Sequence, residues 1–232
     1  MVTSALFCVA AFLLLSPIAV ALSRSPRASG VVYASCLIVT LTLALVGGMC
    51  LIGQPTSRIT LPLGLPWLGA HFRLDALSAF FLIVVNLGGA AASMFALGYG
   101  QHEHTPERVL PFYPAYLAGM NLVVLADDAF SFLVAWEFMS LTSWALVVAH
   151  HQERENLRAG YVYLLMAGFG TLALLLAFGL LAGNDGNYLF ESIRLAQPTA
   201  GVAAMVLVLA LVVAVFAVGE SPGREIVPAR AA

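Results

Sequence analysis

The chain has 232 residues, of which 61% are apolar and only 9% are charged, whereas soluble domains carry about 25% charged residues. A soluble domain of this size cannot bury so much apolar surface, so we expect the lipid bilayer to be its solvent. The net charge of −2 indicates nothing about partners, but a nucleic-acid-binding protein needs a basic stripe, and the sequence has none. All the basic residues are arginines, and the sequence contains no lysine.

Long apolar runs follow one another from the N-terminus onward. The first 23 residues lack the positively charged start of a signal peptide, so we expect them to form a retained first helix. Apolar runs of about 20 residues can span a hydrocarbon core of about 30 Å as helices. The sequence therefore predicts an all-α polytopic transmembrane bundle of about seven helices, over residues 4–22, 31–53, 75–99, 112–126, 129–149, 159–183 and 200–218.

The connections divide the chain further. Residues 54–74 combine prolines, glycines and short β-prone pieces, which predicts an ordered, hairpin-like surface loop. Residues 184–199 contain "YLFESIRLA", which favours a short amphipathic helix at the membrane interface. Asp127 and Asp128 separate the fourth and fifth runs, which predicts a tight, solvated turn between antiparallel helices. We expect four parts: two N-terminal helices (1–53), the loop (54–74), a five-helix part (75–218) and an atypical tail (219–232).

Arginines are distributed unevenly between the two sides of this topology. One side, with the N-terminus and the 54–74 loop, holds Arg58, Arg73 and Arg194, and the other holds the remaining seven. Cytoplasmic loops carry an excess of Lys and Arg. We therefore expect a multi-pass protein of a bacterial inner membrane with its N-terminus and the 54–74 loop extracytoplasmic.

One carboxylate lies in the middle of the fifth run, "FSFLVAWEFMSLTSWALVV" (130–148). Glu137 is ~12 Å from the nearer helix end, where an ionised acid costs on the order of 2.5 kcal/mol or more unless it faces protein or water. It is either a proton relay or a protonated acid that makes one interhelical hydrogen bond, to Ser140 or Thr142. Its placement favours the relay.

Side chains near Glu137 in the helix are candidates for packing around it. Trp136 precedes it, and Ser140, Ser143 and Trp144 follow on a broad common face. Small hydroxylated residues let helices approach and form hydrogen bonds across them. Ordinary helix packing explains these residues equally well.

The Trp-Glu pattern of this run resembles the fifth transmembrane helix of the antiporter-like family. That family includes proton-pumping membrane subunits of respiratory complex I, large subunits of Mrp sodium/proton antiporters, and corresponding subunits of membrane-bound nickel–iron hydrogenases. "FRLDALSAFFLIVV" (72–85) resembles the family's entry into its third helix. Residues 150–175 resemble the branch formed by the antiporter-like subunits of hydrogenase-4 and formate hydrogenlyase. The resemblance covers residues 55–211.

The resemblance implies a non-catalytic membrane subunit of a proton-translocating redox complex. Such a subunit sits in the lipid bilayer, works with other membrane and hydrophilic subunits, and holds no redox cofactor of its own. Glu137 would carry the proton, and Asp75, which has a counterpart in the family, is a weaker candidate. The alternatives are an Mrp-type sodium/proton antiporter, a complex I subunit, or a non-transporting fragment or scaffold.

The loop "HHQERENLR" begins with His150, which is a candidate for proton access because histidine titrates near neutral pH. The alternative is anchoring at the interface together with Arg154 and Arg158, which are also candidates for contact with a partner or with lipid phosphate. The three cysteines lie inside apolar runs without metal-binding spacing, so we expect no metal site.

The sequence also departs from the family. A full member has about fourteen helices, and its broken seventh helix carries a lysine that pairs with the glutamate. This chain has seven runs and no lysine. Without a cation nearby, burial favours the protonated form of Glu137, so we expect that the chain alone does not complete a proton path. Because the likeness fades after residue 211, we expect an amino-terminal fragment, produced by a frameshift, an early stop or a gene-prediction error.

Overall fold

A computed structural model describes residues 1–23, 25, 27–53, 55–64, 69–99, 108–150, 154–183 and 186–218. It confirms an all-α bundle of about seven helices. The helices are α1 (Val2–Leu22), α2 (Ala28–Leu51), α3 (Ala76–Tyr99), α4 (Phe112–Leu125), α5 (Ala129–Val147), α6 (Arg154–Ala182), the short α7 (Phe190–Leu195) and α8 (Ala200–Val218). The other elements are β1 (Ser57–Leu61), β2 (Ala70–Leu74) and a 3-10 turn, η3 (Val148–His150).

Most of these helices are suited to a bilayer. Among the described residues, five are long and apolar enough to cross a membrane by length and composition: α1, α2, α3, α5 and α6. The helix α4 and residues 200–215 of α8 are apolar but shorter. Many leucines, valines and phenylalanines point outward from these helices, which suits a protein whose surroundings are lipid.

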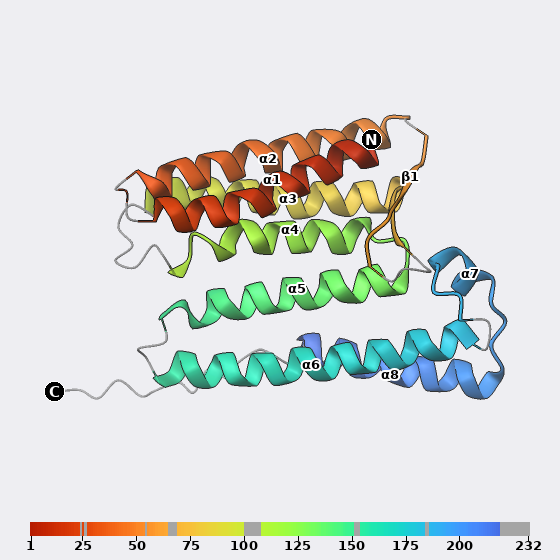
Figure 1. The fold of residues 1–232 in the computed structure, drawn as a ribbon. Coiled ribbons are helices and arrows are strands. Elements are labelled where there is room, and N and C mark those ends of the chain that lie inside the picture. Colours follow the sequence, from red (N-terminus) through yellow and green to blue (C-terminus); the bar gives the residue numbers. More distant parts are fainter. Residues whose placement is uncertain are drawn as a thin grey trace, which may run out of the picture.

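The long helices lie side by side with their axes roughly aligned (Figure 1). The helix α2 packs on α3, α1 packs on α2 and α4, and α5 lies between α4 and α6, which in turn contacts α8. The main buried core lies among α1 to α4 and β2, and includes Phe12, Leu43, Leu82 and Leu117. The N-terminus, the β1–β2 hairpin and α7 lie at one end of the bundle, which we call the hairpin end (Figure 1).

Buried amides join α3 to α4. Asn86 Nδ2 donates to Asn121 Oδ1 over 2.6 Å, and each amide also donates to the backbone carbonyl four residues earlier. Both side chains are fully buried. Further along the same two helices, the hydroxyl of Tyr113 bonds to Ser93 and to the carbonyl of Gly89. Interhelical hydrogen bonds of this kind fix which helices pair inside an apolar bundle.

The connection between α4 and α5 is extended and paired on both edges. Phe72 of β2 bridges Ala126, and Asp128 bridges Leu189. The backbone N–H of Asp127 donates to the His71 carbonyl (2.8 Å), and the Asp127 carbonyl accepts from the N–H of Phe190 (3.1 Å). The expectation of a solvated turn was therefore wrong, because hairpin and α7 segments cover both aspartates; Asp127 is 7% exposed and Asp128 is 0% exposed.

The antiparallel contact between α4 and α5 depends on a glycine. A Cβ atom at Gly119 would lie 2.9 Å from the backbone Cα of Met139, closer than Cβ atoms come to other heavy atoms in proteins. The two helices can therefore approach this closely only with glycine at position 119.

We expect Gly119→Ala to destabilise the bundle by about 1–3 kcal/mol, because the added methyl group pushes against the α5 backbone. Gly88→Ala in α3 is the matched control, since a Cβ there meets no atom within 4 Å. Thermal unfolding of both variants in lipid nanodiscs measures the difference. Equal stability of the two variants would contradict the close α4–α5 contact.

Candidate functional site

Glu137 is the ninth residue of the 19-residue helix α5, so it lies near the middle of a candidate membrane span. The residue is half-buried. Its Oε1 atom is fully buried and accepts no hydrogen bond from the described residues. An unpaired buried polar atom costs about 1–3 kcal/mol, so this carboxyl group is not explained as a structural cross-link.

Among the described residues, Glu137 Oε1 does not form the hydrogen bond that is its alternative role, and both expected partners lie in its own helix, α5. The Thr142 hydroxyl donates to the carbonyls of Phe138 and Met139 in its own helix, each over 2.9 Å. Ser140 is buried, but within the described part of the chain no hydrogen bond joins it to Glu137 Oε1. At its Oε1 atom, the carboxyl group therefore has only packing contacts with the described residues.

One face of α5 beside Glu137 is uncovered by the described helices. Val134 is 54% exposed and Leu141 is 48% exposed. These residues lie three before and four after Glu137, on the same helical face. Glu137 thus lies at the border between the packed side of α5 and a face that is open to lipid or to another helix.

The other predicted packing residues lie towards α6. Trp136 stacks on Phe132, with ring centroids 5.8 Å apart, and Phe132 also meets Phe178 of α6. Trp144 lies against Gly160 of α6. Ser143, which lies between Trp136 and Trp144 in the sequence, is half-buried. The aromatic layer holds α6 on one side of α5, while Met139 packs against α4 on another.

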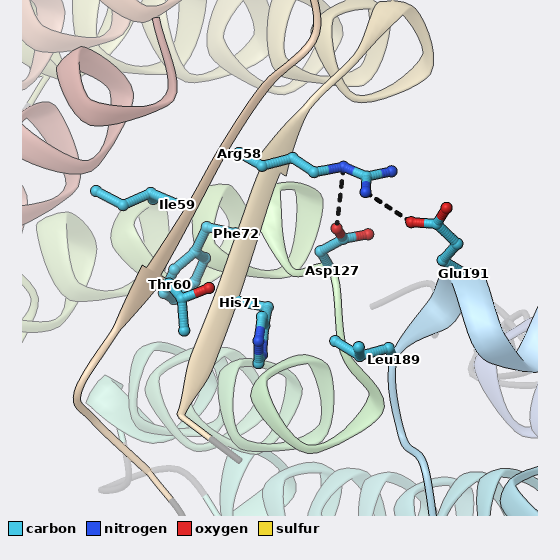
Figure 2. Close-up of a pocket in the computed structure, with 8 residues that line it drawn as sticks. All are labelled: Arg58, Ile59, Thr60, His71, Phe72, Asp127, Leu189 and Glu191. Carbon is cyan, nitrogen blue, oxygen red and sulfur yellow. Dashed lines mark hydrogen bonds and ion pairs between the residues drawn. The ribbon is translucent and has the colours of Figure 1, made fainter.

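A second group of polar residues lies at the hairpin end and forms a chain of alternating charges. Arg73 lies between Asp75 (3.4 Å) and Asp127 (2.9 Å). Arg58 lies between Asp127 (3.8 Å) and Glu191 (2.6 Å). Figure 2 shows the Arg58 guanidinium between the last two carboxylates. The chain ties the start of α3, the hairpin, the α4–α5 connection and α7 together.

Asp75 begins this chain and caps α3. Its Oδ1 accepts the backbone N–H of Ser78 over 2.8 Å. Burial acts to raise the pKa of Asp75, but the hydrogen bond from Ser78 and the charge of Arg73 outweigh it, so the pKa lies below its ordinary value of 3.8. At the other end, the hydrogen bond from Arg58 lowers the pKa of Glu191. Both carboxylates therefore stay ionised near neutral pH.

Asp128 caps α5, the helix that carries Glu137. Its Oδ1 accepts the Ser131 backbone N–H (2.7 Å), and its Oδ2 accepts the Ser131 hydroxyl (2.6 Å) and the His71 backbone N–H (2.8 Å). The His71 Nδ1 atom lies 3.5 Å from the same Oδ2. Asp128 thus joins the first turn of α5 to β2.

A small cavity of about 110 Å³ opens among these groups, lined by Arg58, Ile59, Thr60, His71, Phe72, Asp127, Leu189 and Glu191 (Figure 2). Its walls come from both hairpin strands, the α4–α5 connection and the α7 segment. Four of its eight lining residues, Arg58, His71, Asp127 and Glu191, have ionisable side chains.

The remaining predicted residues are at the opposite end of α5. His150 ends η3 and Arg154 begins α6, but their side chains lie outside the described set. The Arg158 side chain is exposed on the first turns of α6. No contact in the described part of the structure brings these residues or Asp75 to Glu137.

Sequence reasoning missed the charged chain at the hairpin end. The sequence does contain two indications of this chain of charges. Arg58, His71 and Arg73 lie in β-prone pieces of one loop, and two aspartates stand between the apolar runs of the fourth and fifth helices. Their pairing was not visible because Arg58 and Glu191 are 133 residues apart.

The family model and the similar proteins that the comparisons found point to the same family. Residues 126–221, which include Glu137, match the family described as "NADH:quinone oxidoreductase/Mrp antiporter, TM". Hydrogenase-4 component B of Escherichia coli K12 is 34% identical over 140 residues, 60% of this chain and 21% of its own length. The putative antiporter subunit mnhD2 of Staphylococcus aureus is 30% identical over 183 residues, 77% of this chain and 36% of its own length.

The fold is also found in a solved complex. The Mrp complex of Dietzia sp. DQ12-45-1b matches with a TM-score of 0.75 and 23% identity, over 91% of this chain and 23% of the matched chain. This match shows the fold. The chain spans between about a fifth and about a third of the length of these three relatives.

We expect the stabilising effect of Asp75 to disappear in acid. A carboxylate whose pKa is lowered on folding stabilises the folded state above about pH 4, and this contribution is lost as the pH falls through the lowered value. Asp75→Asn keeps a side chain that can cap a helix. Its melting temperature should lie below that of the wild type at pH 6 and approach it near pH 3. A difference that is constant with pH would contradict the ion pair with Arg73.

Proposed function

We propose that this chain moves protons through Glu137. The chain is an antiporter-like membrane protein of the complex I, Mrp and hydrogenase family. We place it as a membrane subunit of a redox complex of the hydrogenase-4 type. The observation that carries the proposal is the buried, unpaired Oε1 of Glu137 in the middle of a membrane span.

The environment of Glu137 supports a transfer role over a structural one. Intramembrane carboxylates are costly and mark ion or proton pathways in many membrane proteins. A group that takes up and releases a proton in each cycle cannot be held by permanent hydrogen bonds to both oxygens. The carboxylates at the hairpin end, by contrast, each have a guanidinium or a set of hydrogen-bond donors beside them.

An ionised Glu137 needs a cation that the described residues do not supply. The chain has no lysine, and no arginine lies between the ends of α5. The exposed face with Val134 and Leu141 is where another membrane helix has room to pack. We therefore propose that a cationic side chain outside the described residues faces Glu137 when the path is complete.

Asp75 and His150 are secondary candidates for proton access. Asp75 is already held by Ser78 and Arg73, so we expect its replacement by Asn to reduce transport less than the loss of Glu137.

A second candidate function is sodium/proton exchange. The similarity to the putative antiporter subunit mnhD2, over a longer part of this chain than the match to hydrogenase-4 component B, supports it. Transport that needs sodium ions and continues without electron transfer would favour exchange. Transport driven by dihydrogen oxidation without sodium would favour the redox complex.

We expect Glu137→Gln to reduce proton translocation at least about tenfold, because the amide keeps the shape but cannot carry a proton. The measurement is dihydrogen-driven acidification of everted vesicles from native cells. Glu191→Gln is the matched control, since it makes the same change on an exposed carboxylate of α7. Full activity of Glu137→Gln, with normal amounts of protein in the membrane, would refute the proposal.

We also propose that the hairpin end faces the extracytoplasmic side, because the topology expected from the sequence puts seven of the ten arginines on the other side. A cysteine placed at the exposed position Glu191 should react in whole cells with a membrane-impermeant maleimide. A cysteine at the exposed position Arg158, on the opposite end, should react only after the cells are opened. The reverse pattern would invert the topology.

A further inference from the structure

His71 and Asp128 form a pair that the proposed path through Glu137 does not use. His71 lies in β2 and Asp128 at the start of α5, 57 residues later. The imidazole Nδ1 lies 3.5 Å from the carboxylate Oδ2. The pair thus links the hairpin to the helix that carries Glu137.

Asp128 is fully buried, and hydrogen-bond donors surround its carboxyl group. It accepts two hydrogen bonds from Ser131 and one from the His71 backbone. Hydrogen bonds from donors of this kind favour the charged form of a carboxyl group. The imidazole of His71 therefore lies beside a carboxyl group that three donors already hold in place.

The His71 ring is buried on one side and accessible on the other. Its Nδ1 atom is fully buried and makes no hydrogen bond with the described residues, although Asp128 Oδ2 lies 3.5 Å away. The side chain as a whole is 23% exposed, so the exposed surface lies on its other atoms. The ring lines the 110 Å³ cavity (Figure 2). In neutral histidine one nitrogen is a donor and the other an acceptor. Asp128 favours the proton on Nδ1, which leaves Nε2 as the acceptor.

We propose that His71 and Asp128 form a proton-binding site at the hairpin end of the bundle. A proton from water adds to Nε2 of His71, while the Nδ1–H faces Asp128. The product is an imidazolium–carboxylate pair, and no other bond is made or broken. The charged pair holds β2 against the first turn of α5 more tightly than neutral imidazole does.

Other charged groups face the site from each neighbouring segment. Arg58 comes from β1, Asp127 from the α4–α5 connection and Glu191 from α7, and all three line the same cavity as His71. Arg58 lies between Asp127 and Glu191, and Arg73 also lies beside Asp127. These carboxylates are thus matched by guanidinium groups, which leaves Asp128 as the charge in direct contact with the imidazole.

The site connects to Glu137 through one rigid element. Asp128 is the N-cap of α5, and Glu137 lies nine residues further, ~14 Å along the helix axis. Protonation of His71 therefore acts on the anchored end of the helix that carries the transfer residue. This effect on transport rests on the proposed function, whereas proton binding itself does not.

The first test is an NMR titration of the full chain in lipid nanodiscs with ring-labelled histidine. His71→Gln assigns the His71 signal among the five histidines. Asp128→Asn removes the charge but keeps a good helix cap, and it should move the midpoint of the His71 titration to lower pH by about one unit or more. Asp75→Asn is the control and should leave it in place. An unchanged midpoint in Asp128→Asn would overturn the proposal.

A second readout covers the case in which Asp128→Asn does not fold. Imidazolium stabilises the folded state at low pH, and this contribution is lost as the pH rises and the ring becomes neutral. The melting temperature of wild type should therefore exceed that of His71→Gln more at pH 5.5 than at pH 8.5. A difference that does not vary with pH would refute the site.

Transport distinguishes this proposal from the role of Glu137. His71→Gln should shift the pH dependence of transport without a comparable loss of rate, while Glu137→Gln should reduce transport at least about tenfold at every pH. If Glu137→Gln proves fully active, the titration of His71 still tests the proton-binding site by itself. If His71→Gln changes neither the pH dependence of the melting temperature nor the pH dependence of transport, the proton-binding site is refuted while the role of Glu137 stands.

Discussion

The pairing of residues 126–128 with β2 on one side and with residues 188–190 on the other is the interaction on which the rest of the structure depends. Backbone groups next to an apolar bundle need partners, and this short connection finds them in His71 on one edge and, together with Ala129, in Tyr188 and Phe190 on the other. It thereby fixes where α5 begins. Because a helix rises by ~1.5 Å per residue, the start of α5 also sets the depth of Glu137 in the membrane.

Local patterns were enough to predict the helices. Apolar runs separated by polar or proline-containing stretches place each long helix within a few residues of its observed bounds, and a lone glutamate in such a run singles out Glu137. Asn86 and Asn121 were not singled out, since each is one polar residue in its own apolar run. Only the folded chain shows that they face each other.

Pairing between distant segments could not be predicted in this way. Two aspartates between helices have the composition of a solvated turn, and nothing near them in sequence indicates a cover. Their burial comes from β2, more than 50 residues earlier, and from the α7 segment, about 60 residues later. The sequence also could not show that Glu137 Oε1 is unpaired. Thr142 was one of its two expected partners, but its hydroxyl bonds to backbone carbonyls of its own helix instead.

The start and the middle of one helix thus carry carboxylates of opposite character. Asp128 is enclosed by donors and anchors α5, whereas Glu137 has a free oxygen in an apolar layer. A fixed charge costs little to keep where donors already surround it, and a group without fixed donors is the one whose charge can change during a cycle. Since a helix transmits displacement of its capped end along its axis, the hairpin end is placed to act on the proton carrier that we propose, Glu137, without touching it.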